Sequence, residues 1–112
     1  MSITWSDAVD QILRVGRTLE DIGVVNWGLT RSQALEALVQ LKDQRIAILG
    51  GDVYESSSEV ILPTCDNWYC DRIEGESKGS FVDRSFEKAR AYIASYEPDS
   101  GRTVLFALVP DV

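Results

Sequence analysis

Apolar residues recur at helical spacing in three segments, and this spacing predicts helices over about residues 5–21, 30–43 and 80–96. In each segment the apolar positions fall on one side of the helix and would form its buried stripe. These positions are Ala8, Ile12, Val15 and Leu19 in the first helix, Ala34, Leu35, Leu38 and Leu41 in the second, and Val82, Phe86, Ala89, Ile93 and Tyr96 in the third.

A polar residue that can cap a helix precedes each stripe, with a capping-box partner three residues later. The three pairs are Thr4 with Asp7, Thr30 with Gln33, and Ser80 with Asp83. Gly23 should end the first helix, because glycine is a poor helix former. Trp27, in the short apolar connector that follows, should pack back onto the core.

The pattern changes to that of strands in the middle and at the end of the chain. The segments are "RIAILGGDVYE" (45–55), "VILPT" (60–64, ended by Pro63), "NWYCDRI" (67–73) and "RTVLFALVP" (102–110). Gly50 and Gly51 lie inside the first strand, which suggests a bulge or a close approach by another backbone. The last segment has consecutive apolar residues from Val104 to Val109, which is typical of a central strand covered on both faces. "SSSE" should be a turn, and "EGESKGS" a mobile polar loop.

The predicted order of elements is α-α-β-β-β-α-β. Strands joined by short loops pair antiparallel. We therefore expect an α+β fold, in which a small, mainly antiparallel sheet of about four strands packs against three helices. A length of 112 residues with 45% apolar residues fits one domain over residues 1–112.

The chain has 11 basic and 18 acidic residues, which gives a formal net charge of −7. This charge argues against binding to nucleic acids or to anionic membranes, and it favours a basic protein partner. No apolar run is long enough to cross a bilayer, and the N-terminus does not resemble a signal peptide, so we expect a cytoplasmic protein. Residues 52–76 contain seven acids and one base, Arg72. Tyr54, Trp68 and Tyr69 share this segment, which favours a binding surface over a face that is merely solvated.

The sequence contains no histidine, which excludes His-based catalysis and His-containing zinc sites. Cys65 and Cys70 are too few for a structural zinc site within one chain. We expect reduced cysteines, although Pro63 could fold the chain back far enough for a disulfide. Asp71 and Arg72 do not make an electropositive pocket, so Cys70 is better explained as a small buried side chain than as a nucleophile.

The "GGD" string lacks the rest of a nucleotide-binding loop. We therefore expect no cofactor and no metal. A catalytic pair of carboxylates stays open, because nothing in the sequence singles out two of the many acids.

Strand alternation separates the residues of "NWYCDRI" onto two faces. The sets are Trp68, Cys70 and Arg72, of which Trp68 and Cys70 suit the core, and Asn67, Tyr69, Asp71 and Ile73, of which Tyr69 and Asp71 suit the exterior. A tyrosine beside an acid can contact an Arg or Lys of a partner. Asp52 and Tyr54 would stand at the exposed end of the earlier strand. Alternatively, Tyr54 lies over the glycines, and the pattern favours neither reading.

The strings "AILGGDVYE", "DNWYC" and "RSFEKARAYIASY", followed by a closing apolar strand, resemble the immunity protein 40 family. The stretch "GLTRSQALEALVQLKDQRI" fits the same pattern, so the resemblance covers roughly residues 27–109. It implies a bacterial immunity protein of polymorphic toxin or contact-dependent growth inhibition systems. Such a protein is not an enzyme; it binds the toxin domain of a cognate effector and blocks it. The motif positions serve either the fold or binding, and they are Gly50, Gly51, Asp52, Tyr54, Asn67, Trp68, Tyr69 and Cys70.

Toxins of such systems are often nucleases and therefore tend to be basic, which agrees with an acidic inhibitor. The candidate contact residues are Asp52, Tyr54, Glu55, Glu59, Asp66, Tyr69, Asp71, Glu74 and Glu76. Two alternatives are a general cytosolic protein-binding module unrelated to a toxin, and a small enzyme that uses carboxylates or Cys70.

Overall fold

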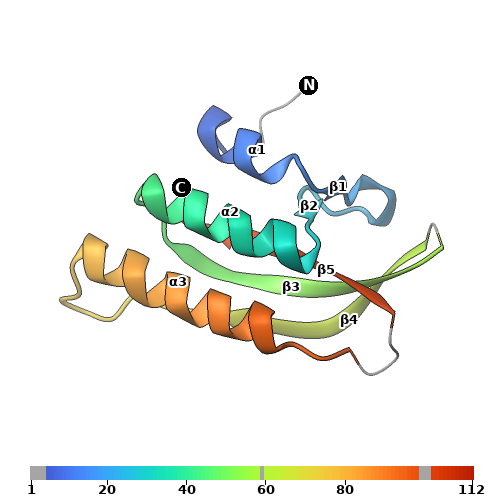
Figure 1. The fold of residues 1–112 in the computed structure, drawn as a ribbon. Coiled ribbons are helices and arrows are strands. Elements are labelled where there is room, and N and C mark those ends of the chain that lie inside the picture. The colour runs from blue at the N-terminus through green and yellow to red at the C-terminus, as the bar shows by residue number, and fades with distance from the viewer. Residues whose placement is uncertain (1–4, 59, 99–101) are drawn as a thin grey trace.

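The computed structural model describes residues 5–58, 60–98 and 102–112. It confirms the α+β class and the predicted order of elements (Figure 1). The elements are α1 (Asp7–Leu13), β1 (Arg17–Thr18), the 3-10 helix η1 (Glu20–Ile22), β2 (Trp27–Gly28), α2 (Arg31–Asp43), β3 (Ile48–Ser57), β4 (Val60–Tyr69), α3 (Lys78–Ser95) and β5 (Thr103–Pro110).

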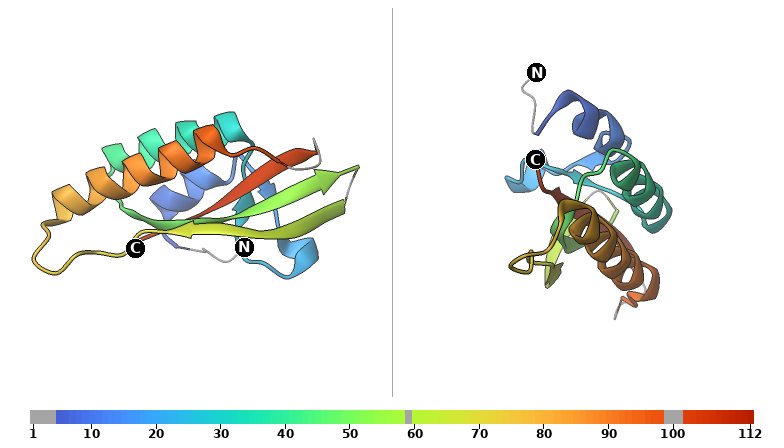
Figure 2. Two further views of the ribbon diagram at one scale, coloured as in Figure 1. Left: turned by 90° about the horizontal axis from the view of Figure 1, so that it is seen from below. Right: turned by 90° about the vertical axis from the view of Figure 1, so that its left-hand side faces the viewer.

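The main sheet has the order β4-β3-β5, and both pairs of strands are antiparallel. Helices α2 and α3 lie side by side on one face of this sheet (Figures 1 and 2). Their apolar stripes pack on the inward side chains of the strands, and Trp27 packs against the edge of the same cluster. The fully buried centre of this main core includes Leu38, Leu41, Ile93 and Phe106.

The segment from β1 to β2 covers part of the opposite sheet face, where η1 is seen on the far side from α2 and α3 (Figure 2). Leu19 and the partly buried Ile22 pack there on Tyr54 and Leu105, in a second and smaller core. Strand β5 is therefore buried on both faces, as its continuous apolar run predicted. The prediction that β5 is central is wrong, because β3 lies between the other two strands. An isolated bridge between Leu29 and Phe106 pairs the outer edge of β5.

The first helix ends at Leu13, well before the predicted boundary. A Cβ atom at Gly16 would lie 2.6 Å from the carbonyl oxygen of Gly28, so the chain passes very close to β2 at this point. Arg17 then pairs with Gly28 in a two-stranded sheet, and this pairing replaces the predicted last turns of the helix. Val15, expected in the buried stripe, is consequently exposed.

The predicted caps are right for one helix and displaced for two. Thr30 and Gln33 form the predicted capping box of α2, with backbone-to-side-chain hydrogen bonds of 3.2 and 3.0 Å. Helix α3 begins earlier than predicted, because the hydroxyl of Ser77 accepts a hydrogen bond from the backbone N–H of Ser80 at 3.2 Å. Ser6 caps α1, while the proposed cap Thr4 lies outside the described residues.

The two segments predicted as separate strands around Pro63 form one strand, β4, so the main sheet has three strands. Proline is tolerated here because β4 is an edge strand. An irregularity accommodates the extra residues: positions 64–66 of β4 stand opposite Val53 alone. Cys65 adopts a positive φ of 70° in this bulge, and the Thr64 hydroxyl donates to the carbonyl of Val53 at 2.8 Å.

Candidate functional site

The paired glycines of the sequence lie against Trp68. Gly50 has a φ of 155°, and a Cβ there would be 2.3 Å from the Trp68 carbonyl oxygen. A Cβ at Gly51 would be 2.3 Å from the Trp68 indole ring. On its other side the ring stacks on Tyr92 of α3, with centroids 4.7 Å apart. These two glycines and Trp68 therefore have a packing role that is sufficient to explain their residue types.

A shallow groove of about 200 Å³ lies on the main sheet. Register places Asp52 opposite Asn67, and Gly50 opposite both Tyr69 and Val109, so these positions share one face. It is the face opposite α2 and α3, because Gly51 and Trp68 point to the helices. We call it the sheet groove, and its lining includes Leu49, Gly50, Asp52, Asn67, Tyr69 and Val109.

The sheet groove combines one carboxylate with apolar and aromatic walls. Asp52 and Asn67 are exposed, and within the described residues the Asp52 carboxylate accepts no hydrogen bond. Tyr69 is 66% exposed, and the ammonium of Lys88 lies 5.3 Å from its ring centroid. Lys88 of α3 therefore already places one cation near the Tyr69 ring. The expectation that Trp68 is buried while Tyr69 is exposed is confirmed.

Tyr54 does not stand at an exposed strand end, which corrects one of the two readings of the sequence. The residue is 7% exposed and packs with Leu19, Ile61 and Leu105 in the second core. Burial, and then the negative charge of Asp52, raise the pKa of its hydroxyl. Leu19 and Ile22 of the covering β1–β2 segment pack on this ring, and that contact is not visible in strand alternation.

The acids of residues 52–76 do not form one surface. Glu55 pairs with Arg102 at 3.9 Å and shares the helix-facing side of β3 with Val53. Asp66 accepts a hydrogen bond of 2.6 Å from the hydroxyl of Tyr96, the C-cap residue of α3. Burial and this hydrogen bond raise the pKa of Tyr96 to about 12. Candidate Glu59 lies outside the described residues.

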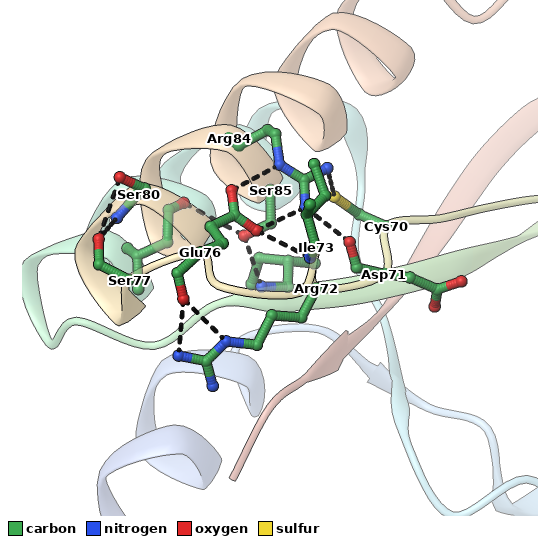
Figure 3. A network of polar contacts seen from close by, with 11 residues as sticks. Cys70, Asp71, Arg72, Ile73, Glu76, Ser77, Ser80, Arg84 and Ser85 are labelled. Carbon is green, nitrogen blue, oxygen red and sulfur yellow. Dashed lines mark hydrogen bonds and ion pairs between the residues drawn. The ribbon is translucent and has the colours of Figure 1, made fainter.

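Residues 71–76, which connect β4 to α3, are held by Arg84 of α3 (Figure 3). We call them the 71–76 loop. The guanidinium of Arg84 donates to both carboxylate oxygens of Glu76 at 2.8 Å, to the carbonyl of Asp71 at 2.6 Å and to the sulfur of Cys70 at 3.2 Å. The Glu76 carboxylate also accepts from the backbone N–H of Ile73 at 3.1 Å. The segment "EGESKGS" (74–80), expected to be a mobile loop, is thus held through Glu76 by an internal network, and its last residues belong to α3.

Glu76 forms an internal ion pair with Arg84, whereas the sequence suggested that its charge was available to a partner. Its side chain is largely buried, and the hydrogen bond from Arg84 lowers its pKa to about 2. Cys70 is buried beside the same guanidinium, so its surroundings are more electropositive than Asp71 and Arg72 indicated. Arg84 was missed because it is eight residues from Glu76, beyond a turn, and no local pattern connects them.

The side chains that the 71–76 loop leaves exposed include Asp71, Ile73 and Glu74. The Ile73 side chain is 57% exposed. Together with Asp52 and Tyr69 they extend from the sheet groove into the connection that follows β4.

Other features favour no second site. A larger hollow of about 370 Å³ lies between the C-terminal end of α2 and the start of α3, where Lys42 and Asp83 pair at 3.8 Å. No group of three or more potential metal ligands occurs in the described parts of the chain. Cys65 is exposed, and both cysteines are free. Among the helices in the described residues, none is long and apolar enough to span a membrane.

Comparison with family models gives a match to most of the chain. The family model described as immunity protein 40 matches residues 18–110, a range that includes the sheet groove and the 71–76 loop. Searches among curated proteins and among solved structures gave no match. Because the match extends over most of the 112 residues, the chain belongs to the immunity protein 40 family.

Proposed function

We propose that this protein neutralises a cognate toxin domain by binding it in the cytoplasm, without catalysis of its own. Family membership supports an immunity function and carries the proposal. The sheet groove and the 71–76 loop offer the surface, because they combine exposed charge with exposed aromatic and aliphatic side chains.

The proposed partner is a basic domain, and a nuclease fits best. The inhibitor carries a net charge of −7. A nuclease site that holds phosphates displays Lys and Arg, which carboxylates can engage in place of phosphate. Opposite charges also steer the encounter and raise the association rate by about 10-fold to 1000-fold at low salt.

Burial and internal contacts argue against four of the candidate contact residues. Glu55, Asp66 and Glu76 engage in internal contacts, and Tyr54 is buried. The exposed candidates that remain are Asp52, Asn67 and Tyr69 at the sheet groove, and Asp71 and Glu74 in the 71–76 loop.

The test is co-expression with the toxin domain encoded in the adjacent gene. The two chains should elute as one complex in size-exclusion chromatography. Nuclease activity of the toxin should fall in proportion to added protein and vanish near an equimolar ratio. A toxin domain that does not bind, or that stays fully active in the complex, would overturn the proposal. Binding only to proteins unrelated to toxins would favour a general binding module.

A further inference from the structure

Ile73 combines an exposed apolar side chain with a backbone that hydrogen bonds hold in place. Its side chain is 57% exposed, although isoleucine gains free energy from burial. Its backbone is fixed on both sides, because the N–H of Ile73 donates to the Glu76 carboxylate and its carbonyl accepts from the N–H of Glu76 at 2.9 Å. An apolar side chain is thus held outward by a closed turn.

The polar backbone groups of the loop find many of their partners inside the protein. Arg84 binds the carbonyl of Asp71, and Arg72 donates to the carbonyl of Glu76 at 3.3 and 3.4 Å (Figure 3). Gly75 supplies the positive φ of 81° that closes the turn. The exposed side chains of the loop are those of Asp71, Arg72, Ile73 and Glu74, of which Arg72 is engaged with the carbonyl of Glu76.

We propose that the 71–76 loop is a preformed binding element that inserts Ile73 into an apolar pocket of the toxin, while Asp71 and Glu74 pair with basic residues at the rim of that pocket. The proposal rests on the proposed function. A segment that is already ordered loses little conformational entropy on binding, and this favours affinity. A second copy of this chain is disfavoured as the occupant, because both surfaces would carry the same negative charge.

Substitution of the anchor tests the proposal by surface plasmon resonance with the toxin domain. Ile73→Ala should weaken binding by about 10-fold or more, mainly through faster dissociation. Val39→Ala is the matched control, since Val39 is an aliphatic residue on α2 that is 46% exposed. It should leave binding unchanged. Thermal unfolding should show both variants folded, because neither side chain is in the core.

Glu76 is a positioning residue in this scheme, so its effect must depend on Ile73. Glu76→Gln removes the paired charge that fixes the loop and should weaken binding several-fold in the wild-type background. In the Ile73→Ala background the same change should have little further effect, because there is no anchor left to position. Additive losses would assign Glu76 a purely structural role and overturn the preformed loop.

The possible failures are distinguishable. If wild-type protein binds the toxin and Ile73→Ala binds within about twofold of it, the loop inference is wrong and the proposed function stands. If wild-type protein does not bind the toxin at all, the proposed function fails, and the loop inference fails with it.

Discussion

The indole ring of Trp68 lies directly against the backbone of Gly51, at a separation that leaves no room for a side chain there. A Cβ at this position would be 2.3 Å from the ring and 2.6 Å from the carbonyl oxygen of Ala107. The backbone on both sides of β3 is paired, so it cannot move away without breaking its hydrogen bonds to β4 or β5. Position 51 must therefore be glycine as long as the Trp68 ring occupies this place.

Gly51→Ala should therefore destabilise the fold by about 1–3 kcal/mol, the usual cost of overpacking a core. Gly79→Ala is the matched control. Gly79 lies in the first turn of α3, and its nearest neighbour would be the flexible end of Arg45 at 3.7 Å. It should stabilise the protein by about 0.5–1 kcal/mol, because alanine is the better helix former. Urea unfolding of both variants measures the difference, and equal stabilities would contradict the close contact.

The sequence predicts well what is decided locally. The capping box of Thr30 and Gln33 needs only residues within one turn, and α2 begins where it was predicted. Helix α1 ends early for a reason outside its own sequence, the pairing of Arg17 with Gly28. The candidate site shows the same difference between features set by local sequence and features set by distant contacts. Alternation alone placed Tyr69 outside and Trp68 inside, whereas the burial of Tyr54 depends on a distant segment that contains Leu19. The contact of Arg84 with the 71–76 loop joins separate elements and has no local signal.

The ion pair of Glu76 and Arg84 predicts a pH dependence of stability. The folded-state pKa of Glu76 is about 2, against an ordinary value of 4.5. Because the folded value is the lower one, the contribution to the free energy of unfolding is complete above about pH 4.5. It is lost as the pH falls towards 2. Wild type should exceed Glu76→Gln in stability above this interval, and the gap should shrink within it.

Glu74→Gln is the control for that comparison, because Glu74 belongs to the same loop and its side chain is exposed. Its stability should follow that of wild type at every pH. The measurement is chemical unfolding at pH values above, within and below the interval. A gap between wild type and Glu76→Gln that stays constant across the interval would contradict the assigned pKa.

Arg31 joins the two helices of the main layer and gives a prediction for stability alone. Its guanidinium donates to the carbonyls of Ile93, Ala94 and Tyr96 at 2.6, 3.1 and 2.7 Å, at the C-terminal end of α3. A cation there also complements the helix dipole. Arg31→Met keeps much of the apolar stem but leaves these carbonyls without their donor.

The expected loss for Arg31→Met is about 1.5–3 kcal/mol, the range for hydrogen bonds to charged groups. Arg14→Met makes the same change of charge at an exposed position and should alter stability by less than about 0.5 kcal/mol. Toxin binding should be equal for both, because Arg31 lies in the helix layer, away from the sheet groove. Thermal unfolding measures the loss of stability. Similar melting temperatures for wild type and Arg31→Met would show that the end of α3 does not need Arg31.

The location of the charge, and not its total, should control the encounter with a basic toxin. Asp52→Lys with Asp71→Lys reverses two charges at the sheet groove and the 71–76 loop. Glu36→Lys with Asp43→Lys makes the same total change on exposed positions of α2.

Stopped-flow association at several salt concentrations should show about a 10-fold or larger loss of rate at low salt for the first pair, with a flatter salt dependence. The second pair shares the change in net charge and should lose much less than the first pair at 0.1 M salt, where screening limits attraction to about 10 Å. Equal losses for the two pairs would mean that the toxin responds only to net charge, and a larger loss for the α2 pair would place the contact on the helices.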